Sequence, residues 1–290
     1  MKPITTFSIV AYDPENSAWG IAVASKFPAV GAVVPWARAG AGAVATQSYA
    51  NTSYGPRGLD LMQAGVPAAE ALQQLVQDDP ERHLRQVGLV DVQGRAATFT
   101  GESCFEWAGG LAGDGYCIQG NILAGGQVID RMAETFEAST APFPERLLEA
   151  LLAGDRAGGD RRGRQSAAIF IVKPDGGYGG FNDRWIDYRV DDHEDPVPQL
   201  ASLLALHRLY FEESPPEDRL PIEGEVCQRL QEILLEQGFS IPEAHGQFDE
   251  ATRKALREFI GNENFEDRTD FKKGLIDRPV YEYLLEKFGA

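Results

Sequence analysis

The sequence predicts an α+β fold with a small helical domain at its C-terminal end. Three observations predict it. β-rich runs near the N-terminus are joined by short turns, helical patterns follow in blocks, and an acidic, proline-rich segment precedes the last part of the chain. Antiparallel strand pairs with helices inserted in blocks favour α+β layers over a regularly alternating βαβ sheet. The length of 290 residues suits one large and one small domain.

The first two strands are predicted to form a hairpin, because two apolar runs flank the turn residues 13–17. The next pair is hinged at Gly40-Ala41-Gly42. This triplet and the glycine-rich stretch 109–115 lack the spacing of nucleotide-binding loops, so both are interpreted as sharp turns. The expected strands span residues 5–12, 18–25, 33–39, 43–47, 86–91, 95–100, 166–172 and 185–190.

Helical periodicity lies between these strands. The last expected helix of the large domain follows Asp195-Pro196, which supplies an N-cap acceptor and a preset φ at the first helical position. The expected helices span residues 56–77, 127–138, 144–152 and 197–211.

The segment 214–221 is predicted to be a stiff, solvated linker, because its acidic residues and prolines cannot pack a core. It divides a domain of residues 1–213 from one of residues 222–290. The second domain contains a degenerate repeat around Phe248-Asp249 and Ile276-Asp277, in which a glycine turn precedes an aspartate that can cap a helix. Together with an amphipathic helix that ends at Gly238, the repeat predicts three short helices around one small core.

Composition excludes several classes of function. The net charge of −17 disfavours binding to nucleic acid or to an anionic membrane surface. Three widely spaced cysteines argue against a disulfide framework, and the start of the chain resembles no signal peptide, so a cytoplasmic protein is expected. His193 lies among consecutive acids whose side chains rarely converge on one ion, so no metal site and no cofactor is expected.

Three polar segments are candidate binding sites. The loop 158–166 carries Arg161, Arg162 and Arg164, whose guanidinium groups match the geometry of a carboxylate or another anion, and Asp160 can orient one of them. A mobile solvated loop is the competing interpretation. The run 47–55 and the segment 179–184 place further hydrogen-bonding side chains near strand ends, although ordinary capping and turn chemistry explains them equally well. The candidate binding residues are Arg38, Gln47, Ser48, Asn51, Asp160, Arg161, Arg164 and Asn182.

Longer stretches carry a resemblance. The runs 6–14 and 19–27, with matching stretches at 45–48, 54–58, 120–123, 158–166 and 177–185, resemble a widespread, largely uncharacterised prokaryotic family. That family has an Ntn-hydrolase-like fold, which is a four-layer αββα sandwich. Residues 222–288 resemble a peptidoglycan-binding helical module. The resemblance therefore implies a four-layer sandwich followed by a small wall-binding domain.

The resemblance also implies a mechanism. Ntn hydrolases cleave amides with an N-terminal Thr, Ser or Cys, whose own α-amine accepts the proton. Thr6 matches the opening threonine of the family, with Ser8 as the alternative nucleophile. Ala24 stands where a carboxylate is expected, so Lys26 is a candidate supporting cation and Arg38 is another. Residues 1–5 precede Thr6, and Lys2 should block removal of the initiator methionine. The mechanism therefore requires cleavage before Thr6.

Two functions follow as expectations. The first is an amide hydrolase that acts on cell-wall-derived or other small peptide substrates. The alternative is a catalytically silent scaffold that binds a small anionic ligand through its arginine-rich loop. The expected partner of the protein is a small molecule or a peptidoglycan fragment. In a further interpretation the C-terminal module serves only docking or assembly into a homo-oligomer.

Overall fold

The computed structural model describes residues 6–212 and 214–289, which form two compact units. The division falls between Leu204 and Ala205, within helix α5 (Pro196–Phe211). The leader whose removal the mechanism requires, residues 1–5, lies outside the described residues.

A six-stranded antiparallel sheet forms the centre of the N-terminal unit, in the order β10-β9-β2-β1-β8-β7. The predicted hairpin of β1 and β2 is present, and its register places Thr6 opposite Ser25 and Asp13 opposite Ala18. The strands of this sheet are β1 (Thr6–Asp13), β2 (Ala18–Ser25), β7 (Gly109–Gly113), β8 (Tyr116–Gly120), β9 (Ser166–Val172) and β10 (Arg184–Val190).

A second, four-stranded antiparallel sheet has the order β3-β4-β5-β6. It packs against the first sheet, with β4 and β5 against β1 and β8. Its strands are β3 (Pro35–Arg38), β4 (Gly42–Ser48), β5 (Arg85–Asp91) and β6 (Ala96–Thr100).

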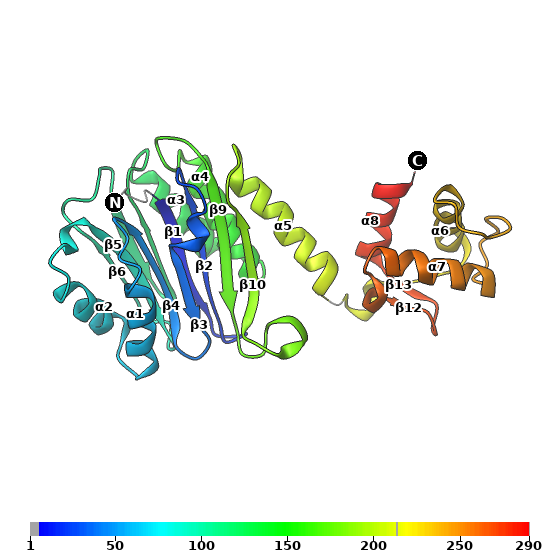
Figure 1. Ribbon diagram of the computed structural model, residues 1–290, viewed down its shortest axis with the longest axis horizontal. Coiled ribbons are helices and arrows are strands. Elements are labelled where there is room, and N and C mark those ends of the chain that lie inside the picture. The colour runs from blue at the N-terminus through cyan, green and yellow to red at the C-terminus, as the bar shows by residue number, and fades with distance from the viewer. Residues whose placement is uncertain (1–5, 213, 290) are drawn as a thin grey trace. The chain divides into compact units, whose positions relative to one another are not determined.

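Helices cover the outer faces of both sheets, as Figure 1 shows. The helices α1 (Tyr54–Gln63) and α2 (Ala68–Gln77) lie on the four-stranded sheet. The helices α3 (Gln127–Ala138) and α4 (Phe143–Arg156) lie on the six-stranded sheet. The N-terminal unit is therefore a sandwich of four layers, in the order helix, sheet, sheet, helix.

Both faces of β1 are buried, because one face packs against the second sheet and the other against helices. Val10 packs between the two sheets, whereas Ile9 and Ala11 point to the opposite face and pack in the core with α3 and α4. Successive side chains of a strand point to opposite faces, so a central strand covered on both sides buries the side chains of both faces. The side chains of Phe7, Ile9 and Val10 are at most 2% exposed.

The sequence did not predict β7 and β8. Residues 109–113, Gly-Gly-Leu-Ala-Gly, contain no β-branched residue, and the glycines were interpreted as a turn. They form an edge strand instead, where packing is undemanding and backbone pairing with β8 suffices. The single helix expected at 56–77 is two helices, because Gly65, with φ of 90°, and Pro67 interrupt it.

The C-terminal unit contains the three expected helices, α6 (Gly224–Glu236), α7 (Glu250–Asn262) and α8 (Arg278–Phe288). It also contains a small sheet that the sequence did not predict, in the order β11-β13-β12. Strand β11 (Arg219–Pro221) lies in the segment expected to be a linker, and it pairs with β13 (Leu275–Asp277), which in turn pairs with β12 (Thr269–Asp270).

The two aspartates of the repeat have different roles. Asp249 caps α7 as expected, because its carboxylate accepts a hydrogen bond of 2.8 Å from the backbone N–H of Thr252. Asp277 precedes α8 but makes no capping bond with its side chain. Its carboxylate lies 2.6 Å from Nε of the buried Arg268. The capping prediction for Asp277 was therefore wrong, because the buried cation takes its carboxylate.

Candidate functional site

Three hydroxyl side chains lie side by side at one end of the six-stranded sheet, where β1 and β9 begin and β2 ends. Thr6 pairs with Ser25, and Ser25 pairs with Ser166. Oγ1 of Thr6 donates a hydrogen bond of 3.3 Å to Oγ of Ser25. All three residues are buried, and Thr6 has no exposed surface. The predicted nucleophile therefore begins the central strand and contacts a second hydroxyl.

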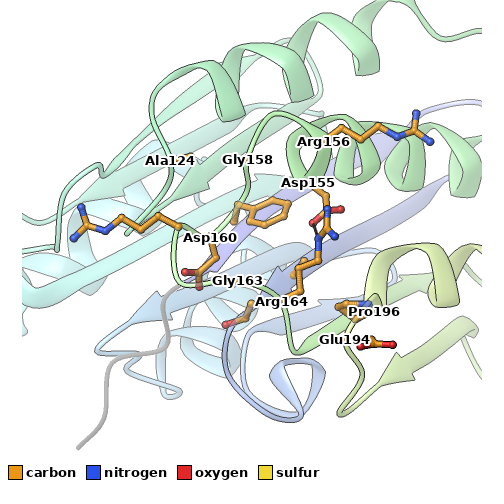
Figure 2. A pocket seen from close by; sticks show the side chains of 13 residues that line it. Ala124, Asp155, Arg156, Gly158, Asp160, Gly163, Arg164, Glu194 and Pro196 are labelled. Atoms are coloured by element: carbon orange, nitrogen blue, oxygen red, sulfur yellow. Dashed lines mark hydrogen bonds and ion pairs between the residues drawn. The ribbon is translucent and has the colours of Figure 1, made fainter.

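A pocket of about 620 Å³ opens at this end of the sheet (Figure 2). Its wall includes Phe7 and Ser25, which are the chain neighbour and the strand partner of Thr6. The remaining wall comes from the C-terminal end of α4, the arginine-rich loop 158–164, and the start of α5. We call it the arginine pocket. The predicted residues Asp160, Arg161 and Arg164 therefore line the same pocket as these two neighbours of Thr6.

Arg164 holds two segments of the pocket wall together. Its Nε lies 2.8 Å from Asp155 at the end of α4, and a terminal nitrogen lies 2.8 Å from Asp195 before α5. Figure 2 shows the side chain reaching toward Asp155. The hydrogen bond with Asp155 raises the pKa of Arg164, so this guanidinium stays charged. Through these two ion pairs Arg164 fixes the loop to the end of α4 and to the segment before α5.

Asp160 is buried and contacts an arginine of the loop, Arg162. Its carboxylate accepts hydrogen bonds from the guanidinium of Arg162, at 3.1 Å and 2.8 Å, and from the backbone N–H of Lys26 at 3.1 Å. Nζ of Lys26 donates to the carbonyl oxygen of Arg164 at 3.0 Å. The predicted supporting cation thus joins the end of β2 to the arginine-rich loop.

Two further arginines of the pocket are available to a ligand. Arg156 and Arg161 are exposed, and within residues 6–212 and 214–289 their side chains form no hydrogen bond or ion pair. Glu194, on another part of the wall, is likewise exposed. The sequence did not single out Arg156, Asp155 or Ser25. The predicted hairpin could have pointed to Ser25, because a short turn brings the end of the second strand beside the start of the first, whereas the other two required the position of α4.

Ser8 and Gln47 belong to a buried polar network between the two sheets. Oγ of Ser8 donates to Oε1 of Gln47 at 2.7 Å and accepts from Nε2 of Gln119 at 2.7 Å. Nε2 of Gln47 donates to Gln86, to the carbonyl oxygen of Thr6 and to that of Gln119. We call this the amide network; its members are Ser8, Gln47, Gln86, Gln119 and Asn121, all with no exposed surface.

Asn51 lies in a separate ionic cluster at the end of the four-stranded sheet. Its amide donates to Asp79 at 3.0 Å, and Asp79 also accepts from Nε of Arg85 at 3.0 Å and from Tyr54 at 2.9 Å. Burial acts to raise the pKa of Asp79, but the hydrogen bonds from Arg85 and Asn51 hold that pKa well below its usual range. The local sequence gave no signal for this cluster.

Ser48 ends β4 with a left-handed φ of 65°, which is uncommon for a residue other than glycine. Its side chain is buried beside Cys104. Burial raises the pKa of the Cys104 thiol, so this cysteine is poorly suited to act as a nucleophile.

Arg38 and Asn182 meet elsewhere. Both line a smaller pocket of about 390 Å³. A terminal nitrogen of Arg38 donates to Asp60 at 2.8 Å and to Gln63 at 2.6 Å, and Asn182 accepts from the backbone N–H of Arg184. Arg38 and Ser48 lie at opposite ends of the β4 register. The predicted binding residues therefore divide among five places: the arginine pocket, the amide network, the Asp79 cluster, the end of β4 beside Cys104, and this smaller pocket.

Among the described residues, no group of three or more His, Cys, Asp or Glu side chains is arranged to hold a metal ion. Across the same residues, none of the helices combines the length and apolarity needed to cross a membrane.

Comparison with known proteins places this architecture in a family. Residues 6–200 match the family model described as "Family of unknown function (DUF1028)". The chain belongs to this family. A crystal structure of a DUF1028 protein, SPO2555 from Silicibacter pomeroyi, is 32% identical with a TM-score of 0.66, over 72% of this chain and 88% of that one. The expected membership of an uncharacterised family is confirmed.

The C-terminal unit has its own match. Residues 210–284 match the family model described as "Putative peptidoglycan binding domain". The comparison with curated proteins gives no match. The description of the DUF1028 family names no activity.

Proposed function

We propose that the DUF1028 domain is an Ntn-hydrolase-like amidase whose substrate is a small, carboxylate-bearing amide bound in the arginine pocket. One observation carries the proposal: Thr6 begins the central strand, and its hydroxyl lies 3.3 Å from the hydroxyl of Ser25, which forms part of the pocket wall. The four-layer order of helices and sheets supports the Ntn-hydrolase-like assignment.

The arginines define the substrate class. Arg156 and Arg161 line the pocket without an acid partner among the described residues, and guanidinium groups bind carboxylates with two parallel hydrogen bonds. Peptide-derived amides carry such carboxylates. The match of residues 210–284 to a peptidoglycan-binding model supports cell-wall peptides as their source.

The chemistry requires one preliminary step. Hydrolysis of the peptide bond before Thr6 consumes one water and frees the α-amine of Thr6, whose ordinary pKa near 8 suits a general base. The hydroxyl oxygen of Thr6 then attacks the substrate carbonyl, and the α-amine accepts the hydroxyl proton and passes it to the leaving amine. A second water hydrolyses the acyl ester and restores the hydroxyl.

The test combines the mass of the purified protein with two substitutions at one position. We expect the chain to begin at Thr6 and to release amines from N-acylated peptides. Thr6→Val, which keeps the shape and removes the hydroxyl, should abolish release, whereas Thr6→Ser should retain part of it. Hydrolysis by a chain that still carries residues 1–5, or by Thr6→Val, would contradict the mechanism.

A second candidate function is ligand binding without catalysis. It is favoured by the complete burial of Thr6, whose hydroxyl does not itself line the arginine pocket. In that case Thr6→Val should leave the thermal stabilisation by a carboxylate ligand unchanged, and Arg161→Gln should remove it. Assembly into a homo-oligomer and a cytoplasmic location stay predictions.

A further inference from the structure

A second charged pocket lies within the C-terminal unit, beside the hairpin of β12 and β13. Its volume is about 470 Å³, and we call it the hairpin pocket. Its wall carries four cationic and three carboxylate side chains, although the chain as a whole has a net charge of −17. The pocket is therefore locally cationic on an acidic protein.

Internal pairing leaves two of these cations available. Arg268 is buried and paired with Asp277 at 2.6 Å, and Arg219 shares the same carboxylate at 3.4 Å. Arg257 and Lys272 are exposed, and within the described parts of the chain their side chains have no acid partner. The guanidinium of Arg257 lies over the ring of Phe271, 5.0 Å from its centroid, which restricts where this cation can point.

The acids of the wall do not cancel this charge. Asp270 accepts hydrogen bonds from the backbone N–H groups of Lys272 and Lys273, and Nζ of Lys273 lies 3.6 Å from it. Asp267 is exposed on the wall, and its negative charge offsets the charge of one cation. The balance still favours an anionic ligand.

A buried hydroxyl adds an independent observation. Thr269 lines the pocket and is 7% exposed, and its Oγ1 has no hydrogen-bond partner among residues 6–212 and 214–289. Buried polar groups in folded proteins nearly always have a partner. The wall of the hairpin pocket thus holds one hydrogen-bonding group that the described residues leave without a partner.

We propose that the hairpin pocket binds a carboxylate of the peptide portion of peptidoglycan. The cationic wall selects a carboxylate, and the match of residues 210–284 to a peptidoglycan-binding model selects its source. The two exposed cations engage the carboxylate as charge-assisted donors. This inference is independent of catalysis in the arginine pocket, because it concerns retention on the wall and no bond is broken.

The experiment measures how the full-length protein is retained by insoluble peptidoglycan. Native sacculi are compared with sacculi whose carboxyl groups have been converted to amides with a carbodiimide and ammonia. The test variants are Arg257→Gln, Lys272→Gln and the double substitution, all at exposed positions. The control is Arg229→Gln, an exposed arginine of α6 that pairs with Glu232 and does not line the pocket.

We expect the double substitution to weaken retention at least about tenfold, because it removes two charge-assisted hydrogen bonds. The wild-type protein should be retained equally weakly on amidated sacculi, and the control should bind as the wild type does. The double substitution should not change the release of amines from soluble N-acylated peptides, which separates this site from the proposed amidase. Equal retention of wild type and double variant, equal retention on native and amidated sacculi, or preferential binding of a nucleic acid at this pocket would each overturn the proposal.

Discussion

Replacing Gln47 with leucine should destabilise the N-terminal unit through the amide network between its sheets. Gln47 makes hydrogen bonds to Ser8, to Gln86 and to two carbonyl oxygens. Leucine is apolar and of similar size, so the substitution removes all of these bonds with little change in packing. Its effect therefore measures the network.

The expected loss in the free energy of unfolding depends on which partners of Gln47 keep another hydrogen bond. Oε1 of Gln86 still accepts from the side chain of Asn121 at 2.8 Å, and the carbonyl of Thr6 still accepts from the backbone N–H of Asn121 at 3.0 Å. The hydroxyl proton of Ser8 loses its acceptor and is left buried, at a cost of about 1–3 kcal/mol. With about 0.5–1.5 kcal/mol for each lost bond, offset by the apolar gain of leucine, we expect a loss of about 3 kcal/mol.

Tryptophan fluorescence during urea unfolding is the appropriate assay. All four tryptophans of the chain, Trp19, Trp36, Trp107 and Trp185, lie in the N-terminal unit, so the signal reports that unit alone. The double substitution Ser8→Ala/Gln47→Leu removes the orphaned hydroxyl but also the acceptor of Gln119 Nε2, so its loss should be about 1 kcal/mol smaller than the sum of the two single losses. A Gln47→Leu protein within about 0.5 kcal/mol of the wild type, or a double variant with strictly additive losses, would refute this reasoning.

Three further predictions concern the charged sites. Arg161→Gln should weaken binding of a carboxylate ligand by about ten- to a hundredfold, because a hydrogen bond to a charged group contributes about 1.5–3 kcal/mol; calorimetric titration measures it, and unchanged affinity would exclude Arg161 from the site. Arg268→Met should reduce the stability of the C-terminal unit by about 3 kcal/mol, at the low end for a broken buried pair because Arg219 still lies 3.4 Å from Asp277. Hydrogen exchange of β13 measures this loss, with the exposed Arg229→Met as control. The depressed pKa of Asp79 means that its ion pair stabilises the folded state above the ordinary aspartate pKa of about 4 and that this contribution is lost as the pH falls further. Asp79→Asn should therefore flatten the acid side of the stability profile measured by tryptophan fluorescence, and an unchanged slope would contradict the assignment.

Local sequence predicted those features that depend on neighbouring residues. The β1–β2 hairpin followed from two apolar runs and a short turn, and the arginine pocket followed in part from a loop that carries Asp160, Arg161 and Arg164 within five positions. The edge strand β7 escaped prediction, because backbone pairing rather than side-chain preference forms it.

Features that depend on distant pairing were not accessible. Gln47 and Asn51 are four residues apart, yet one enters the amide network and the other joins the Asp79 cluster, because the chain leaves β4 between them. Arg38 was grouped with the substrate-binding residues by its charge, but the antiparallel register carries it to the opposite end of β4 from Ser48. Which side chains meet across a sheet is set by the pairing of distant strands, and the sequence of one segment does not contain that information.

The amide network has a consequence for how the two sheets are aligned. Apolar faces alone tolerate a relative displacement of the sheets, because one aliphatic contact replaces another with little change in buried area. Amide groups do not, since Nε2 of Gln47 and of Gln86 must meet particular carbonyl oxygens of the facing sheet, at Thr6, Gln119 and Gly120. The network thus selects a single alignment of the sandwich and fixes where the first residue of β1 lies relative to the sheet opposite.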